Sequence, residues 1–535
     1  MNLALLCIPL VLSAFTHLFN STGFPCVSFD ESIYVRRSLH ILEGLGPQDP
    51  SSRFDHGQET NSSYDHPHFG QIFLAGIFQI IGYPSSLHTL PTVESIEMLY
   101  TVPRILMGVL AVVDTFLLYK IVERRYNRNV ALVSSILFAV MPLGWLNRWI
   151  LLDNILLPFL LLSILFALYV KRNNNNNLDS SEKDTQDSIN SKNSNDSKKI
   201  ILTILSGIFL GLAIYTKITA FTMIPLVGFL IFTNNKSFKS LALWLVPVIL
   251  IPSLWPLYAL SAGQFNEWID GVLWQSTERR VDAAENSPHS VLSELTTLAK
   301  MDPVLVTISI VGAAYMVIRR DYFVLLWIAP FLIFAIIIHW VYFFHFVLLL
   351  PAACIASALL IVEVPKRILK KAKHQKLLTI TIISGIGLFG LVGITTVLNT
   401  NYLLTQILHV SLAINSLQGP QNNNKDITII SAPEYSWIFK YIFNEEYAYQ
   451  TRESSIKTDK ILLMVDRSYY SVVSRDPLKP EKENEQQVKL LMSIYNNTNP
   501  KISIIDDDVP SNLQKYPYTN VKNCSFKNLQ IRTNY

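Results

Sequence analysis

The sequence contains few charged residues for its length. Asp, Glu, Lys and Arg make up 16% of its 535 residues, whereas hydrophobic residues make up 50%. Soluble globular domains carry about 25% charged residues, so this composition excludes an ordinary soluble protein. The uncharged residues form long apolar runs, which predict helices that cross a membrane.

We expect about eleven such spans, with boundaries uncertain by a few residues. The apolar runs lie near residues 1–19, 100–119, 130–147, 153–170, 200–216, 217–233, 240–260, 303–318, 322–339, 341–362 and 377–398.

Three further absences narrow the class of protein. No Lys or Arg precedes residue 36, so the first run lacks the positive start of a signal peptide and we expect a retained span, with a cleaved signal as the alternative. Four cysteines are too few for a disulfide framework. Cys7 and Cys354 fall in spans, and a disulfide between Cys26 and Cys524 remains an alternative.

No Gly-rich phosphate loop is present, so we expect no nucleotide chemistry.

Positive charge in short loops predicts the orientation, because such loops stay in the cytoplasm. The basic loops are residues 119–129, 234–240, 319–321 and 363–376. With eleven spans they share one side only if the N-terminus is cytoplasmic and the C-terminus external. The net charge of +4 is mostly explained by these loops and indicates no nucleic-acid partner.

The polar segments differ in character. Residues 171–199 are mainly Asn, Ser, Asp and Lys, which predicts a disordered cytoplasmic insert. After residue 399, "DITIISAP", "KILLMVD" and "KISIIDDD" are short β-like runs, and "EYSWIFKYIF" reads as a helix. The fold class that we expect is a polytopic α-helical membrane protein with a small external C-terminal α/β domain.

We place the domain boundary between residues 398 and 399. The membrane domain, residues 1–398, has two large external loops, 20–99 and 261–302, and the α/β domain covers residues 399–535.

Charged residues at the external ends of spans are the candidates for chemistry, because charge is costly in hydrocarbon. The candidates are Asp30, Glu31, Asp65, His66, Arg104, Arg148, Asp153 and Lys217. Under the predicted orientation they all face one compartment and can line one cavity.

Each candidate also has a structural interpretation. Asp30 can N-cap the helix that ends at Gly44, and Asp65 or His66 can cap a helix that starts at Pro67. The side chains of Arg104, Arg148 and Lys217 can simply extend from the ends of spans to water. Asp55, Asp65 and His68 suggest a divalent metal site as an alternative, but their spacing is not that of a tight ligand set, so we expect no resident metal.

The order of five motifs is more specific than any single residue. They are "FDESIY", "HPHFG", "PRILMGVL", "FAVMPLGWLNRWILLDNILLPFLLL" and "GIFLGLAIYTKITAF". The series resembles the dolichyl-phosphate-mannose:protein O-mannosyltransferases and the related lipid A aminoarabinose transferases, which are membrane glycosyltransferases of the GT-C fold. The resemblance covers roughly residues 1–235.

The resemblance implies a GT-C-like membrane domain that transfers a sugar, mannose by default, from a polyprenyl-phosphate carrier to a hydroxyl of a protein or a glycan. Asp30 of the acidic pair matches the catalytic base, with Glu31 beside it, and inversion at the sugar is expected. Arg104, Arg148, Asp153 and Lys217 match family positions. His68 stands where the family motif His-Pro-Pro-Leu-Gly has its second proline, and this departure leaves the acceptor open.

Glu31 has two interpretations: it raises the basicity of Asp30 as a neighbouring charge, or it pairs with an arginine to hold the loop. For the phosphate we expect Arg104 and Lys217, with Arg279 and Arg280 as looser candidates.

Two other functions remain as alternatives. An oligosaccharyltransferase would carry Trp-Trp-Asp-Tyr-Gly in its external domain, and this sequence has no such stretch. A lipid-linked sugar flippase without transferase activity would have polar residues midway through several spans, and these are sparse.

Overall fold

The structure is a computed structural model of the chain. It describes residues 3–535 with the exception of 26, 48–63, 171–184, 274, 277–289, 339–340, 399–401, 418–426, 446–447, 451–457, 466–468, 470–480 and 505–528. Cys26, Asp55, Arg279, Arg280 and Cys524 therefore lie outside the described residues.

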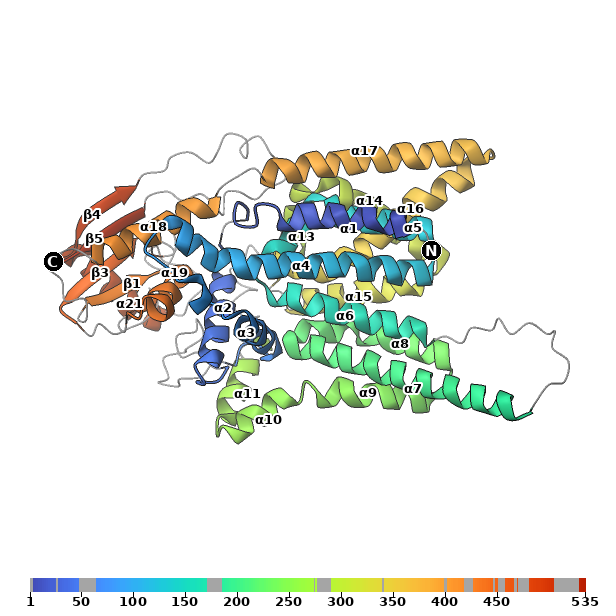
Figure 1. Ribbon diagram of the computed structural model, residues 1–535, viewed down its shortest axis with the longest axis horizontal. Coiled ribbons are helices and arrows are strands. Elements are labelled where there is room, and N and C mark those ends of the chain that lie inside the picture. The colour runs from blue at the N-terminus through green and yellow to red at the C-terminus, as the bar shows by residue number, and fades with distance from the viewer. Residues whose placement is uncertain are drawn as a thin grey trace.

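A bundle of long helices forms most of the molecule, and all eleven predicted runs coincide with helices of this bundle (Figure 1). These helices are α1 (Leu3–Leu18), α4 (Val93–Arg125), α5 (Arg128–Val140), α6 (Leu152–Tyr169), α7 (Thr185–Thr216), α8 (Ile224–Asn235), α9 (Phe238–Leu250), α14 (Pro303–Arg319), α15 (Tyr322–Ile338), α16 (Leu350–Ile368) and α17 (Ala372–Leu398).

Among the described residues, seven helices are long and apolar enough to cross a membrane, or eight if α5 and the 3₁₀ helix η2 (Pro142–Arg148), which meet at 68°, form one span. Four apolar helices are shorter than the 18 residues that span about 27 Å, namely α1, α14, α15 and the helix Phe69–Ile81. The protein is thus a helical membrane protein with seven to eight candidate spans, fewer than the eleven expected.

The predicted disordered insert is partly wrong. Helix α7 begins at Thr185, so residues 185–199 are helical. A helix held by an apolar segment can extend into a polar one, because each added residue gains a backbone hydrogen bond once a nucleus exists. The other insert residues, 171–184, lie outside the described part of the chain.

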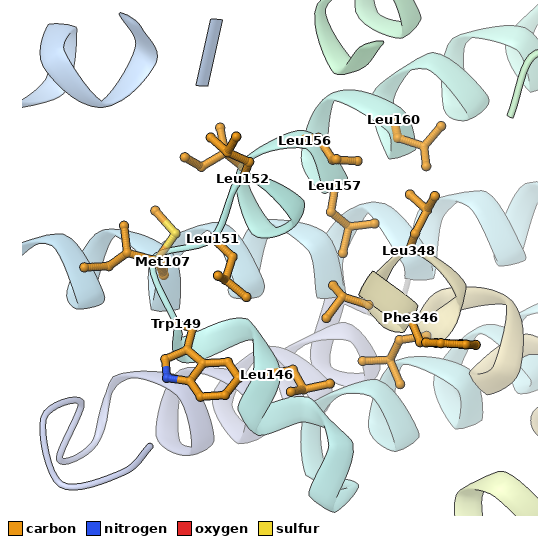
Figure 2. Packing of buried hydrophobic residues seen from close by; sticks show 14 of the residues in the cluster. Met107, Leu146, Trp149, Leu151, Leu152, Leu156, Leu157, Leu160, Phe346 and Leu348 are labelled. Atoms are coloured by element: carbon orange, nitrogen blue, oxygen red, sulfur yellow. The ribbon is translucent and has the colours of Figure 1, made fainter. Parts of the chain in front are cut away.

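The core of the bundle is a continuous apolar cluster centred on α6. Leu157 and Leu160 of α6 lie opposite Leu348 and Phe346 of the 3₁₀ helix η5 (Phe343–Leu349) (Figure 2). Leu157 and Leu160 are fully buried, and between membrane helices such side chains stabilise the fold through van der Waals packing. This packing fixes the helix ends from which the polar residues project.

Short helices lie at one end of the bundle, next to the C-terminal sheet, and we call this the head end (Figure 1). They are α2 (Phe29–Leu42), α3 (Phe69–Ile81), α10 (Leu254–Ser261), α11 (Phe265–Leu273) and α13 (Val291–Met301).

Basic loops meet at the other end of the bundle. Arg125, the last residue of α4, pairs with Asp321 at 3.3 Å, and Arg319 pairs with Glu363 of α16. Three of the four basic loops are joined by these two ion pairs.

The C-terminal part is a five-stranded mixed sheet in the order β2-β1-β3-β5-β4. Strand β1 (Ile427–Ser431) pairs in parallel with β2 (Ala448–Gln450) and β3 (Lys460–Val465), whereas β5 (Leu529–Thr533) runs antiparallel to β3 and β4 (Asn499–Ile504). The three predicted β runs are β1, β3 and β4, and the predicted helix is α19 (Pro433–Trp437) followed by the π-helix η7 (Ile438–Ile442). Helix α18 (Tyr402–Leu417) precedes the sheet, and α21 (Glu481–Asn497) precedes β4.

Candidate functional site

Helix α2 carries the acidic pair. Its N-cap is Ser28, whose backbone N–H donates to Glu31 Oε2 at 2.8 Å, so the interpretation of Asp30 as the N-cap is wrong. Asp30 lies inside the first turn and is partly exposed, where the helix dipole favours a carboxylate. The helix ends as expected, with Gly44 in the left-handed conformation at φ 77°.

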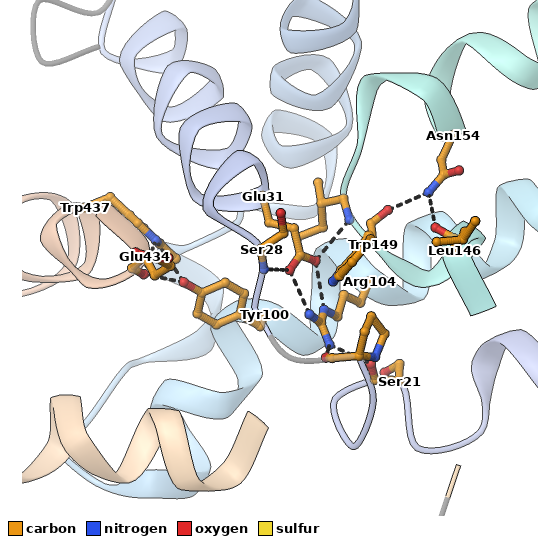
Figure 3. A network of polar contacts seen from close by, with 12 residues as sticks. Ser21, Ser28, Glu31, Tyr100, Arg104, Leu146, Trp149, Asn154, Glu434 and Trp437 are labelled. Atoms are coloured by element: carbon orange, nitrogen blue, oxygen red, sulfur yellow. Dashed lines mark hydrogen bonds and ion pairs between the residues drawn. The ribbon is translucent and has the colours of Figure 1, made fainter. Parts of the chain in front are cut away.

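Glu31 is bound to an arginine. Arg104 of α4 donates from Nε to Oε1 at 2.9 Å and from Nη2 to Oε2 at 2.7 Å, and Nη1 donates to Pro25 O at 2.7 Å (Figure 3). The backbone N–H of Ile150 donates to Glu31 Oε1 at 3.0 Å. Both charged side chains are completely buried. Glu31 therefore joins α2, α4 and the turn before α6, and this geometry favours the loop-holding interpretation.

The same contacts bear on the expected role of Arg104. Every nitrogen of the Arg104 guanidinium already donates to Glu31 or to the backbone oxygens of Ser21 and Pro25. This geometry favours a role for Arg104 in holding the loop.

Asp153 and Lys217 form a second buried pair. Lys217 Nζ lies 2.6 Å from Asp153 Oδ2, with side-chain exposures of 4% and 3%. Asp153 stands in the first turn of α6, and Lys217 precedes the 3₁₀ helix η3 (Ile218–Met223). The Lys217 ammonium also lies 5.9 Å from the centre of the Phe344 ring. The structure brings together two predicted residues that are far apart in sequence.

Asp65 forms a third buried pair, with Arg37 of α2 at 2.8 Å. The backbone N–H of His66 donates to the same carboxylate at 3.0 Å. Burial alone raises the pKa of Asp65, but the charges of Arg37 and His66 outweigh it and hold the pKa below its usual value. Asp65 is thus an anion that is bound by Arg37 of α2.

Tyr34 of α2 lies close enough to these groups for their charges to act on it. It is 3% exposed, and its ring centre lies 6.3 Å from that of His66. Burial raises its pKa well above the ordinary value, and three carboxylates add to this shift while Arg37 opposes it. These three carboxylates are Asp30, Asp153 and Asp65. The candidate site is therefore the surroundings of the Tyr34 phenol, where predicted residues from α2, α6 and residues 64–66 converge.

The sequence analysis missed Tyr34 and Arg37. A signal was present, because Asp30, Tyr34 and Arg37 are spaced i, i+4 and i+7 and so share one face of a helix.

Arg148 is held at the end of η2. Its Nη2 donates to the backbone oxygens of Phe19, at 2.7 Å, and Asn20. Its Nε and Nη1 are buried and have no hydrogen-bond partner among the described residues, and neither side-chain polar atom of Asn147 has one. Buried donors without partners cost about 1–3 kcal/mol each, so the Arg148 guanidinium has donors left for an anionic group, a role that the sequence analysis gave to other cations.

His68 is part of an aromatic contact. Its ring centre lies 5.7 Å from that of Tyr64 and 5.4 Å from that of Tyr258 in α10. Burial lowers its pKa to about 3, and Arg37 acts in the same direction. His68 is therefore neutral and joins α3 to α10. Among the described residues no group of three His, Cys, Asp or Glu could hold a metal ion, and the alternative metal site gains no support.

The comparison with protein families gives one match. The family described as dolichyl-phosphate-mannose-protein mannosyltransferase matches residues 55–258. This range contains Asp65, His66, Arg104, Arg148, Asp153 and Lys217 but not the acidic pair. No curated protein matches the chain.

Two solved structures share the architecture. The first is ArnT from Cupriavidus metallidurans bound to undecaprenyl phosphate, with 12% identity, a TM-score of 0.55, and coverage of 88% of this chain and 94% of that one. The second is AglB from Archaeoglobus fulgidus, an archaeal oligosaccharyltransferase in complex with an inhibitory peptide and a dolichol-phosphate. It has 11% identity, a TM-score of 0.56, and coverage of 92% and 72%. At these identities the likeness establishes the fold, which is GT-C-like.

Proposed function

We propose that the chain is a polyprenyl-phosphate-sugar glycosyltransferase of the dolichyl-phosphate-mannose-protein mannosyltransferase family, whose model matches residues 55–258. It moves a sugar, by default mannose, to a hydroxyl of a protein Ser or Thr or of a glycan. Asp30 is the general base. Transfer takes place at the head end of the bundle.

One observation carries the assignment of the base. Four carboxylates stand at or beside the candidate site, and three of them are buried and paired with a cation: Glu31, Asp65 and Asp153. Asp30 alone among these four is partly exposed. A general base must reach the proton that it removes, so Asp30 is the carboxylate that an acceptor can contact.

The reaction is a single displacement. The acceptor oxygen bonds to the anomeric carbon on the face opposite the phosphate, and its proton passes to Asp30. The bond from that carbon to the phosphate oxygen breaks, and its electron pair leaves with the polyprenyl phosphate. The configuration at the anomeric carbon of the sugar is therefore inverted.

Cations must stabilise the leaving phosphate as its charge grows. Two buried donors of Arg148 without partners among the described residues support this role for Arg148. Lys217 is the second candidate, because it pairs with Asp153, one of the carboxylates whose charge acts on Tyr34. His66 and Asp65 would then border the acceptor side.

We further propose the arrangement in the membrane. Eleven spans result if α1, α14 and α15 also cross, and the joined basic loops then lie in the cytoplasm together with the N-terminus. The head end and a C-terminal domain of residues 399–535 lie outside. The relatives bound to undecaprenyl phosphate and dolichol-phosphate make a polyprenyl-phosphate donor the first to test.

The test compares Asp30→Asn with wild-type chain in vesicles that contain a polyprenyl-phosphate sugar, with hydroxylated peptides and glycans as acceptors. We expect transfer to fall by about 10²- to 10⁴-fold, while binding of the lipid donor persists because the amide keeps the shape of the carboxyl group.

The matched control is Asp321→Asn, a partly exposed Asp at the far end of the bundle, which should transfer sugar normally. Equal rates of transfer by Asp30→Asn and wild type would show that Asp30 is not the general base. A wild type that moves no sugar but flips labelled lipid between leaflets would establish the transporter alternative.

A further inference from the structure

The C-terminal domain contacts the bundle through a buried polar network beside α2. Trp437 Nε1 donates to Tyr100 Oη at 3.2 Å and to Glu434 O at 3.1 Å, and Tyr100 Oη donates to the same Glu434 oxygen (Figure 3). The two rings meet edge to face, with centres 5.6 Å apart. Trp437 is completely buried and Tyr100 is 1% exposed, so an acceptor could not use these groups.

Tyr100 lies one turn before Arg104 on α4, and residues four apart share a helix face. One turn of α4 therefore binds the C-terminal domain through Tyr100 and the first turn of α2 through Arg104 and Glu31.

The domain also acts on α2 directly. Helix α19 packs against α2, and the charge of Lys440, from the π-helix η7, acts on Glu43 at the far end of α2. There burial raises the pKa of Glu43, the C-cap residue, and the charges of His40 and Lys440 oppose this shift. Helix α2 is thus packed against the domain through α19. A π-helix interrupts regular geometry, and such interruptions occur frequently at functional sites.

We propose that Trp437 and Tyr100 are positioning residues, which fix helix α2 so that Asp30 meets the acceptor, and that the C-terminal domain is a part of the catalytic apparatus. This inference rests on the proposed function of Asp30. It differs from the view of the domain as a separate acceptor-binding module, because the groups that join it to the bundle face α2 and α4.

The experiment uses the full chain with two conservative variants, Tyr100→Phe and Trp437→Phe. Each keeps an aromatic ring and removes one hydrogen-bonding group. The matched control is Tyr469→Phe, because the Tyr469 hydroxyl is also buried and donates to a backbone oxygen, that of Leu491 at 3.2 Å, but inside the domain. Turnover is measured with a polyprenyl-phosphate sugar, and amide hydrogen exchange is measured in α2.

We expect kcat to fall by up to about tenfold in both variants, as one lost hydrogen bond implies, with the KM values for donor and acceptor little changed. Exchange in α2 should become faster in both, whereas the control should keep wild-type kcat and wild-type exchange.

Exchange needs no turnover, so it separates the two proposals. A wild type without transferase activity would end the proposed function, while faster exchange in α2 would still show the coupling. Unchanged exchange in α2, equal effects in the control, or a rise in the acceptor KM alone would each overturn the positioning role.

Discussion

Ion pairs at the two ends of the bundle differ in burial. At the head end, Glu31–Arg104, Asp65–Arg37 and Asp153–Lys217 all have side-chain exposures of 4% or less. At the basic end, Arg125–Asp321 and Arg128–Glu123 join side chains that are 11–61% exposed. The same chemistry is therefore used in two dielectric environments.

The difference teaches what each set of pairs does. Taking two charges out of water costs several kcal/mol per ion, so buried pairs are a poor way to gain stability. Their value is fixed geometry, and at the head end they fix α2, α4 and α6 around Tyr34. The exposed pairs cost little and contribute about 0–1 kcal/mol each.

Breaking the most buried pair should have the largest effect. Arg104→Met leaves the Glu31 carboxylate in the interior without its guanidinium, and removing one partner of a buried pair costs about 3–5 kcal/mol. We expect a large drop in the unfolding midpoint of the purified protein.

The double variant Arg104→Met with Glu31→Gln should recover part of this loss, because no buried charge is then left unpaired. A single variant that keeps wild-type stability but no longer binds the lipid donor would show that Arg104 binds the phosphate instead of holding the loop.

Breaking the Asp65–Arg37 pair by pH should have a smaller effect. The pKa of Asp65 is lower in the folded state than the ordinary value, so its contribution is present above the unfolded pKa of about 3.9 and is lost as the pH falls through the folded value. We therefore expect the unfolding temperature of the wild-type protein to fall when the pH is lowered below about 4.

Asp65→Asn is the control, since an amide does not titrate. Its stability should be lower than that of wild type at neutral pH, and the difference should shrink as the medium becomes acidic. A constant difference between the two proteins from neutral to acidic pH would contradict the pairing.

Sequence reasoning located the helices of the bundle well because hydropathy averages over many residues. It located β1, β3 and β4 but missed β2 and β5. Strand β2 has three residues, and β5 contains Arg532, whose buried guanidinium donates to Thr498 O and Tyr495 O. Such partners exist only after folding, so no local pattern indicates that this arginine lies in a sheet.

The candidate site shows the same limit. Seven of the eight predicted residues, all but Arg148, fall in buried pairs or directly beside a member of one. The choice of Arg104 as the partner of Glu31, and of Lys217 as the partner of Asp153, depends on helix packing across the bundle. Arg37 was missed because its partner Asp65 comes from a loop 28 positions away.

Breaking an exposed pair should have the smallest effect. Arg128 is 61% exposed and its Nε lies 3.1 Å from Glu123 Oε1, so water screens the attraction and Glu123 keeps Lys120 at 3.0 Å. Arg128 also stands in the first turn of α5, where a cation opposes the helix dipole. We expect Arg128→Gln to change the free energy of unfolding by less than about 1 kcal/mol and to make it less dependent on salt. A loss of stability comparable to that of Arg104→Met would mean that burial does not separate the two sets of pairs. The geometric role assigned to the head-end pairs would then be wrong.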